Sequence, residues 1–437
     1  MSAGDWESWG RVRAEAQRCH VPRWADKGAQ VFVGDGPYLP RGRGRSYGDS
    51  CLVSHGTLIA TRALDHFVEF DTETGRLRAQ AGVGLDAILA LVMPRGWFLP
   101  VTPGTKFVSL GGAIANDVHG KNHHAAGTFG RHVRRLSLLR SSGESMICSE
   151  DENPELYRAS IGGLGLTGLI QWAEIQLKPI STYRIVQEAA PFASLAELVA
   201  LSEAADRDWE YTVAWVDCFS RRRRGVFFRG RHLDSDAGHE TGAIRTEPRI
   251  SVPMDMPGIV LNRLSMKLFN ALYYRAERDR STTVDFDRFF YPLDAIGHWN
   301  RIYGRKGFYQ YQCVVPLPEG TEVIERILQL AEERRTGSFL SVVKVFGDIA
   351  SPGMMSFPRR GLTLALDFPN RGQPTLDMLE RFDALVREAG GAVYPAKDAR
   401  MSRESFAAYY PRWREFAAHI DPAFRSDFWR RVTGAAQ

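Results

Sequence analysis

Apolar and polar residues alternate in short runs through the first 180 residues, and clusters of glycine separate these runs. Alternation with a period of two residues predicts β-strands, and glycine-rich breaks predict tight turns between them. The predicted strands cover residues 31–33, 58–61, 67–70, 76–81, 133–139, 145–149 and 170–177. Apolar residues at helical spacing predict a helix at 85–94, and a short helix is expected near 12–18.

Longer periodic segments follow residue 180. Strands are predicted at 211–217, 225–229, 309–315, 341–346 and 362–368, and helices at 194–205, 260–274, 322–335 and 376–389. Residues 231–257 are polar and lack periodicity, which predicts a long loop. We therefore expect an α+β fold with two domains. Residues 1–180 and the returning tail 392–437 form the first domain, and 181–391 form an antiparallel sheet with helices on one face.

The composition is that of a globular protein with two domains. A chain of 437 residues is too long for one ordinary core, and 44% of its residues are hydrophobic and 24% charged. The net charge of +5 does not predict binding to nucleic acid, but it suits an anionic ligand or an acidic membrane surface.

The cysteines and the N-terminal residues exclude further classes of protein. The five cysteines are scattered and include no C-x-x-C pair, so neither a metal cluster nor a disulfide framework is expected. The first residues lack the basic and apolar regions of a secretory signal, and no apolar run is long enough to span a membrane. We expect a cytoplasmic protein, with peripheral contact at the inner membrane face left open.

Three glycine-rich clusters, at 42–48, 104–112 and 162–168, each lie beside a predicted strand. Backbone N–H groups in such loops can bind an anion, and the first cluster also carries arginines. It is neither a P-loop nor a dinucleotide-binding fingerprint, because the required spacing and strand–helix context are absent. The second cluster leads into 119–124, where a lysine and three histidines supply positive charge and protons. Three unrelated tight turns are the alternative, and a metal site is not expected at the histidines.

The three clusters together resemble the FAD-binding domain of the vanillyl-alcohol oxidase type of flavoprotein. The resemblance implies that the first loop wraps the pyrophosphate and that the later clusters line the ribityl chain and the isoalloxazine. Many members attach the flavin covalently through the His of a Gly-x-Gly-His-Ser run, but Arg45 stands at that position here, which implies non-covalent FAD. The implied FAD contacts are Arg41, Gly42, Arg43, Gly44, Arg45, Ser46, Tyr47, Thr102, Pro103, Gly104, Thr105, Gly111, Gly112, Ala113, Asn116, Asp117, His119, Gly120, Asn122, His123, Gly165, Gly168, Ile170 and Tyr394.

Five motifs, at 44–49, 119–124, 310–312, 344–347 and 394–400, are similar to those of the flavoprotein subunits of decaprenylphosphoryl-β-D-ribose 2′-epimerases. The resemblance implies oxidation of the ribose 2′-hydroxyl of a polyprenyl-phosphoryl-β-D-ribose to a 2′-keto intermediate. This is the first half of an epimerisation that yields an arabinose donor for cell-wall glycans, and a separate NAD(P)H-dependent keto-reductase would complete it. The alternatives are an FAD-dependent oxidase of a free sugar, alditol or aldonolactone, and a flavin-free protein that binds another nucleotide or phosphate.

The resemblance assigns catalysis to Lys397, His119 and Tyr47. Oxidation of an alcohol by hydride transfer needs a group that accepts the hydroxyl proton, and a lysine can do so only if its pKa is lowered. Gln310 and Gln312 are two residues apart on a predicted strand and therefore share a face, which suits hydrogen bonds to sugar hydroxyls. The expected substrate-binding residues are Lys121, Trp215, Gln310, Gln312, Lys344, Phe346, Ala365 and Tyr394.

These assignments have structural alternatives. Lys397 could be a solvated lysine beside Asp398, and His119 could only shape the flavin bed. Trp215 could be an ordinary core residue. Ala365 stands where mycobacterial members carry a cysteine, which implies that covalent inhibitors of that cysteine would not be captured here.

A run of four arginines at 221–224 and the basic amphipathic segment 260–274 are the remaining features of note. The arginine run is typical of a solvated hairpin tip. Alternatively, the two segments form a surface that meets anionic lipid and admits a prenyl tail.

Overall fold

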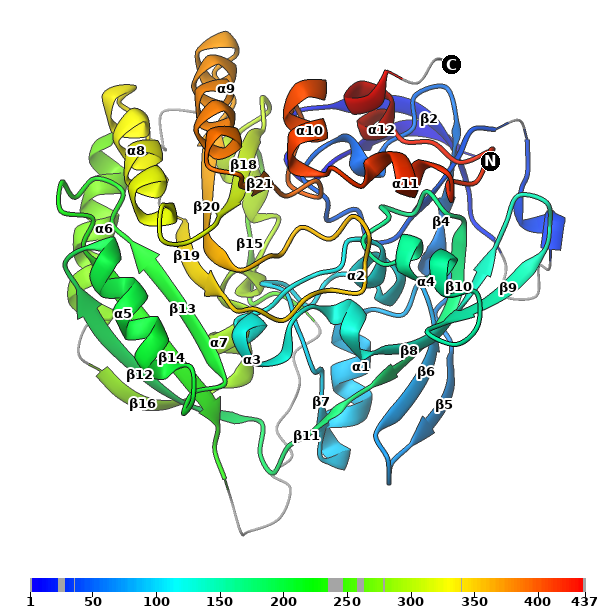
Figure 1. Cartoon of the computed structure of the whole chain (residues 1–437), viewed down its shortest axis with the longest axis horizontal. Helices are drawn as coiled ribbons and strands as arrows, with labels where there is room; N and C mark the ends of the chain where they lie inside the picture. Colours follow the sequence, from blue (N-terminus) through cyan, green and yellow to red (C-terminus); the bar gives the residue numbers. More distant parts are fainter. Residues whose placement is uncertain are drawn as a thin grey trace.

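The computed structural model describes residues 2–22, 28–34, 36–234, 247–257, 263–277, 280–338 and 340–434. Two parts lie side by side (Figure 1), the first built mainly from the N-terminal 180 residues and the second from the residues that follow. The C-terminal tail, with helices α10 (Arg403–Tyr409), α11 (Trp413–Ala417) and α12 (Asp427–Thr433), returns to the first part.

The first part contains two sheets, whose strands are β1 (Ser2–Glu7), β2 (Ala14–His20), β3 (Tyr38–Arg41), β4 (Thr57–Ala60), β5 (Phe67–Asp71), β6 (Arg76–Gln80), β8 (Val133–Leu139), β9 (Ser145–Ser149) and β10 (Leu169–Gln176). The smaller sheet has the order β1-β2-β4-β3, with β2 and β3 parallel to β4. The larger one is antiparallel, with the order β5-β6-β10-β8-β9. Helix α1 (Leu85–Val92) packs its apolar stripe, which includes Ile88 and Leu89, into the core of this sheet.

The second part is one antiparallel sheet of eight strands, in the order β16-β12-β14-β13-β19-β20-β18-β21. Its strands are β12 (Arg184–Phe192), β13 (Tyr211–Val216), β14 (Gly225–His232), β16 (Arg280–Asp285), β18 (Phe308–Val315), β19 (Ser341–Phe346), β20 (Gly361–Pro369) and β21 (Ala392–Val393). Helices α5 (Leu195–Ala205), α8 (Gly320–Glu333) and α9 (Gln373–Glu388) cover one face. In α8, Ile324, Ile327, Leu328 and Ala331 recur at helical spacing and are buried in the core that the helices share with the sheet.

The predicted α+β architecture is confirmed, but two local predictions are wrong. Residues 14–20 form strand β2 instead of a helix, because they pair with β1 on one side and β4 on the other, and these ladders outweigh the local pattern. Residues 28–31 form a 3₁₀ helix where a strand was expected at 31–33. The sequence pattern did not predict strands β12 and β16. Residues 235–246 of the predicted loop and 258–262 before α6 lie outside the described residues.

Two further properties concern membranes and metals. No helix within the described ranges combines the length and the apolar character that crossing a bilayer requires. The same part of the chain contains no group of three or more His, Cys, Asp or Glu side chains placed to hold a metal ion.

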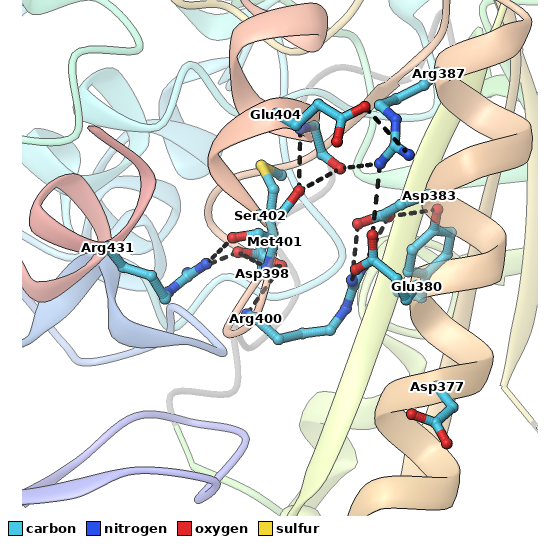
Figure 2. Close-up of polar contacts among 12 residues, drawn as sticks. Asp377, Glu380, Asp383, Arg387, Asp398, Arg400, Met401, Ser402, Glu404 and Arg431 are labelled. Carbon is cyan, nitrogen blue, oxygen red and sulfur yellow. Dashed lines mark hydrogen bonds and ion pairs between the residues drawn. The ribbon is translucent and has the colours of Figure 1, made fainter. Parts of the chain in front are cut away.

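An ion-pair network fixes the segment that follows β21 (Figure 2). Asp398 accepts hydrogen bonds from Arg431 Nη2 of α12 at 2.8 Å and from the backbone N–H of Met401 at 2.9 Å. Arg400 forms two hydrogen bonds of 2.7 Å with Asp383 of α9. Arg431 also pairs with Asp49, beside the first glycine cluster, at 2.8 Å. The segment is therefore held to both parts of the molecule by buried charge pairs.

The first glycine cluster packs directly against this segment. The backbone N–H of Tyr47 donates to the carbonyl of Ala396 at 2.8 Å. A Cβ on Gly48 would lie only 1.6 Å from the carbonyl oxygen of Asp398, so no other residue fits there without a backbone shift. The network thereby fixes the glycine loop and the tail as one unit.

Asp398→Ala should lower the free energy of unfolding by about 3 kcal/mol, because it removes one partner from a buried charge network. Burial opposes ionisation of Asp398, but Arg431 and Arg400 hold its pKa below the ordinary value. The stabilisation therefore persists at neutral pH and is lost as the pH falls below the ordinary pKa of a carboxyl and through the lowered pKa of Asp398. Denaturant unfolding at neutral and acid pH measures both effects.

Glu404→Ala is the matched control for this variant. Glu404 is 80% exposed and lies 3.7 Å from Arg387 in the same network, so its removal should cost less than about 1 kcal/mol. Equal losses in the two variants would contradict the assignment of Asp398.

Candidate active site

The face of the large sheet that lacks α5, α8 and α9 is polar near its centre. Residues paired across antiparallel strands point to the same face, so the pairing identifies the side chains that share it. In three rows across the strands, this face carries Gln310 and Asp367; Gln312, Ala365, Val342 and Trp215; and Thr363 and Lys344. Tyr311 points to the opposite face, where its hydroxyl donates to Asp383 of α9. Polar groups in the middle of a buried sheet are costly unless they have partners or a ligand.

A cavity of about 310 Å³ lies between this face and the glycine-rich loops of the first part. Residues of all three glycine clusters reach its wall, together with the tail segment. Of the residues predicted from the sequence, the wall contains Arg41, Gly42, Arg43, Gly44, Arg45, Ser46, Tyr47, Pro103, Gly104, Thr105, Gly111, Gly112, Asn116, His119, Gly165, Gly168, Ile170, Gln310, Gln312, Lys344, Ala365, Tyr394 and Lys397. Segments far apart in the sequence thus converge on one site.

Lys397 enters the cavity from the tail segment. Its Nζ donates a hydrogen bond to Gln310 Oε1 and lies 4.0 Å from the centroid of the Tyr47 ring. Burial lowers the pKa of Lys397 to about 7, although the Asp367 carboxylate opposes this shift. A substantial fraction of Lys397 is therefore a neutral amine near pH 7, and a neutral amine can accept a proton.

Asp367 orients the partner of Lys397, and the sequence did not single it out. Its Oδ1 accepts a hydrogen bond of 2.6 Å from Gln310 Nε2. An ionised carboxylate only accepts hydrogen bonds, so it fixes the amide of Gln310 with the oxygen turned toward Lys397. Asp367 is only 1% exposed, and burial raises the pKa of its carboxyl. The available signal was an acidic residue inside the apolar strand 361–369, two positions after Ala365 and so on the same face.

His119 is a neutral ring inside an aromatic cage. Its centroid lies 4.9 Å from that of Phe346, 5.7 Å from Phe357 and 5.3 Å from Tyr394. Burial lowers its pKa well below the ordinary value, and Lys344 lowers it further. Its Nε2 lies 2.9 Å from Gln312 Nε2, and its Nδ1 has no hydrogen-bond partner among the described residues. The ring can therefore exchange a hydrogen bond with a ligand, but it does not carry charge at neutral pH.

Two more lysines near the site are half-buried, and neither has a carboxylate partner among the described residues. Lys344 Nζ lies 3.4 Å from the carbonyl oxygen of Gly120, and burial lowers its pKa to about 8. Lys121 Nζ donates to the carbonyl of Phe289, and burial together with Lys344 lowers its pKa to about 7. No acidic side chain in the described ranges offsets these shifts. An anion placed beside the two amines would restore their charge.

Several residues predicted from the sequence lie outside the cavity wall and support it: Thr102, Ala113, Asp117, Gly120, Lys121, Asn122, His123, Trp215 and Phe346. Asp117, for example, accepts hydrogen bonds from Ser356 and from the backbone N–H of Gly130, the latter at 2.8 Å. His123 packs against the ring of Phe346 at 4.5 Å. Trp215 shares the polar sheet face but packs against Tyr273 at 4.9 Å.

The first-part wall fits FAD. Its glycines leave backbone exposed to the cavity, and a Cβ on Gly104 would meet no atom within 4 Å, so the space beside it is open to a ligand. Three arginines flank the first loop, and the buried Nε of Arg45 has no partner among the described residues. The Arg45 guanidinium lies over the Trp9 ring, 4.0 Å from its centroid. Unshielded backbone and the unpaired Nε donor of Arg45 suit a pyrophosphate and a flat ring system.

Comparisons with known proteins agree with this site. The sequence profile of an FAD binding domain matches residues 34–149. The chain is 34% identical over 431 residues to the decaprenylphosphoryl-β-D-ribose oxidase of Mycolicibacterium smegmatis, a match that covers 94% of this chain and 91% of that protein. It is also 34% identical to an uncharacterised protein in the mprA 5′ region of Streptomyces coelicolor, over 80% of this chain and all of that protein. A D-arabinono-1,4-lactone oxidase of Yarrowia lipolytica is 27% identical over 40% of this chain and 32% of its own length.

Bound FAD should be released when the protein is denatured with acid, because an arginine occupies the position of the flavin-linking histidine. The measurement is flavin absorbance in the supernatant and the pellet after acid precipitation of the yellow protein. Free FAD mixed with an unrelated precipitated protein gives the background. Flavin that stays with the washed pellet would contradict non-covalent binding.

Proposed function

The chain belongs to the family of FAD-dependent decaprenylphosphoryl-β-D-ribose oxidases, and from this membership we propose that it oxidises the ribose 2′-hydroxyl of a polyprenyl-phosphoryl-β-D-ribose. It is an FAD-dependent oxidoreductase. The product would be the 2′-keto sugar, the first half of a 2′-epimerisation. The observation that carries this proposal is a lysine of lowered pKa, held at the cavity between Tyr47 and Gln310.

Lys397 is the base in this proposal. The neutral amine accepts the proton of the 2′-hydroxyl while the carbon loses its hydride, so the C–O bond becomes a carbonyl and the electron pair leaves with the hydride. Bound FAD supplies the hydride acceptor. Gln310 holds Lys397 in place, and Gln312 and His119 offer hydrogen bonds to neighbouring hydroxyls or to the flavin. Tyr47 and the buried sheet face exclude water from the amine.

The substrate phosphate is assigned to the amine of Lys344 in the cavity wall, with the amine of Lys121 adding positive charge from outside the wall. They lack a carboxylate partner in the described part of the chain, and a phosphodiester would supply the missing negative charge. A free sugar, alditol or aldonolactone would leave both amines uncompensated. This is why the phosphorylated sugar is favoured over the free one.

The proposed product also implies a partner and a compartment. A 2′-ketone becomes the arabinose epimer only after hydride delivery to the opposite face, which is the reaction class of a nicotinamide-dependent keto-reductase. The five cysteines are all buried and free, in keeping with a reducing compartment such as the cytoplasm. We propose that the enzyme works there, at the inner face of the membrane.

The rate at which substrate reduces the bound flavin should rise with pH through about 7 and then level off, because only the neutral amine of Lys397 accepts the proton. Lys397→Met should slow this step about 10²- to 10⁴-fold and remove the pH dependence. Asp367→Asn removes the carboxylate that raises the Lys397 pKa, so it should move the midpoint to lower pH. Anaerobic stopped-flow absorbance measures the rate of flavin reduction against pH for the unmodified protein and both variants. An unchanged midpoint in Asp367→Asn would contradict the electrostatic effect of Asp367 on Lys397.

Lys344→Met should raise the KM for a prenyl-phosphoryl ribose about 10- to 100-fold, the worth of one hydrogen bond to a charged group, and leave FAD binding intact. The test is anaerobic bleaching of the flavin by a panel of prenyl-phosphoryl pentoses, free pentoses, alditols and aldonolactones. Bleaching by the phosphoryl riboses alone supports the proposed function. Rapid bleaching by a free polyol, with no effect of Lys344→Met, would replace it with a soluble-sugar oxidase.

A further inference from the structure

Helix α6 (Arg263–Glu277) lies on the same face of the large sheet as the active site. Tyr273 packs against Trp215 with ring centroids 4.9 Å apart, and Trp215 pairs across the sheet with Val342 of the cavity wall. Asn270 Nδ2 donates to Asp217 Oδ1 at 3.0 Å, just after β13. These contacts fix the inner side of the helix beside the cavity.

The outer side of α6 is apolar and exposed. Leu268 is 61% exposed, Phe269 46% and Leu272 58%. Leu268 and Leu272 are one helical turn apart, so they form a continuous ridge. Lys267 and Arg275 are exposed on the same helix and flank the ridge with positive charge. An apolar ridge flanked by cations is the surface of an interfacial helix.

The neighbouring hairpin between β13 and β14 adds to this charge. The run of four arginines is divided: Arg223 turns inward to Glu332 at 3.4 Å, and Arg224 pairs with Asp217 at 3.4 Å. Arg221 and Arg222 are exposed at the hairpin tip, and no ion pair within the described residues involves them. The Arg224 guanidinium also lies 4.6 Å from the centroid of the Tyr274 ring, which joins the tip to α6. The surface as a whole therefore carries unpaired positive charge around an apolar ridge.

We propose that the outer side of α6 and the tip of this hairpin dock on a bilayer that contains anionic phospholipid. The ridge enters the headgroup region, and the four exposed cations contact lipid phosphates. The use of this surface rests on the proposed function: α6 borders the row from Trp215 through Val342 and Ala365 to Gln312, so a substrate anchored in the membrane by its prenyl tail would reach the cavity along the sheet.

The test is co-sedimentation of the FAD-loaded protein with phosphatidylcholine vesicles, with and without phosphatidylglycerol, at low and high salt. Binding is expected to anionic vesicles and to weaken with salt. Leu268→Ser/Leu272→Ser and Lys267→Glu/Arg275→Glu should each weaken binding about tenfold or more. The matched controls are Val68→Ser on β5, where Val68 is 51% exposed, and Arg381→Glu on α9, and both should bind like the unmodified protein.

Failure of docking and failure of the proposed function give different results. All variants should reduce their flavin normally with a short-chain, water-soluble prenyl-phosphoryl ribose, since α6 contributes no residue to the cavity wall. Absence of vesicle binding, or equal binding by the α6 variants, overturns the docking proposal even if that substrate is oxidised. Self-association through α6 overturns it as well. The sign of this outcome is sedimentation that depends on protein concentration, that Leu268→Ser/Leu272→Ser abolishes, and that occurs without vesicle binding.

Discussion

The carboxylate of Asp398 decides where Lys397, the proposed base, lies. It accepts hydrogen bonds from Arg431 and from the backbone of the tail, while the adjacent Arg400 binds α9. Both contacts are buried, so the position of Lys397, which directly precedes Asp398, is fixed by charge pairs and does not depend on the lysine itself. Because the backbone of Gly48 lies against the same turn, a change in the network displaces the glycine loop and the amine together.

The site contains more lysine amines than carboxylates that could neutralise them. Lys397, Lys344 and Lys121 are half-buried, Lys344 lowers the pKa of the other two, and Asp367 offsets the shift of Lys397 alone. Burial of uncompensated amines costs stability, and it is compatible with folding here because the amines can release protons. In the proposed function, the negative charge of the bound diphosphate and phosphodiester offsets this cost.

The sequence alone led to the fold class, the flavin and most of the cavity wall, because glycine clusters and the tail motif at 394–400 are local features with a known resemblance. It missed whatever depends on pairing between distant segments. Strand β2 exists because two neighbours pair with it, and Asp367 matters because register places it opposite Gln310. Trp215 was expected at the sugar pocket, and only the position of α6 explains why it packs against Tyr273. Long-range geometry of this kind leaves no trace in periodicity.

The two-residue strand β21 has a consequence for the independence of the domains. It adds to the edge of the large sheet beside β18, yet it belongs to the tail that returns to the flavin-binding part. A fragment that ends at residue 391 would lack this edge strand, and a fragment that begins there would lose the anchor of Lys397. The two halves therefore share an edge of the large sheet. Any movement of one half against the other would have to break the pairing of β21 with β18 or bend the short segment between β21 and Lys397.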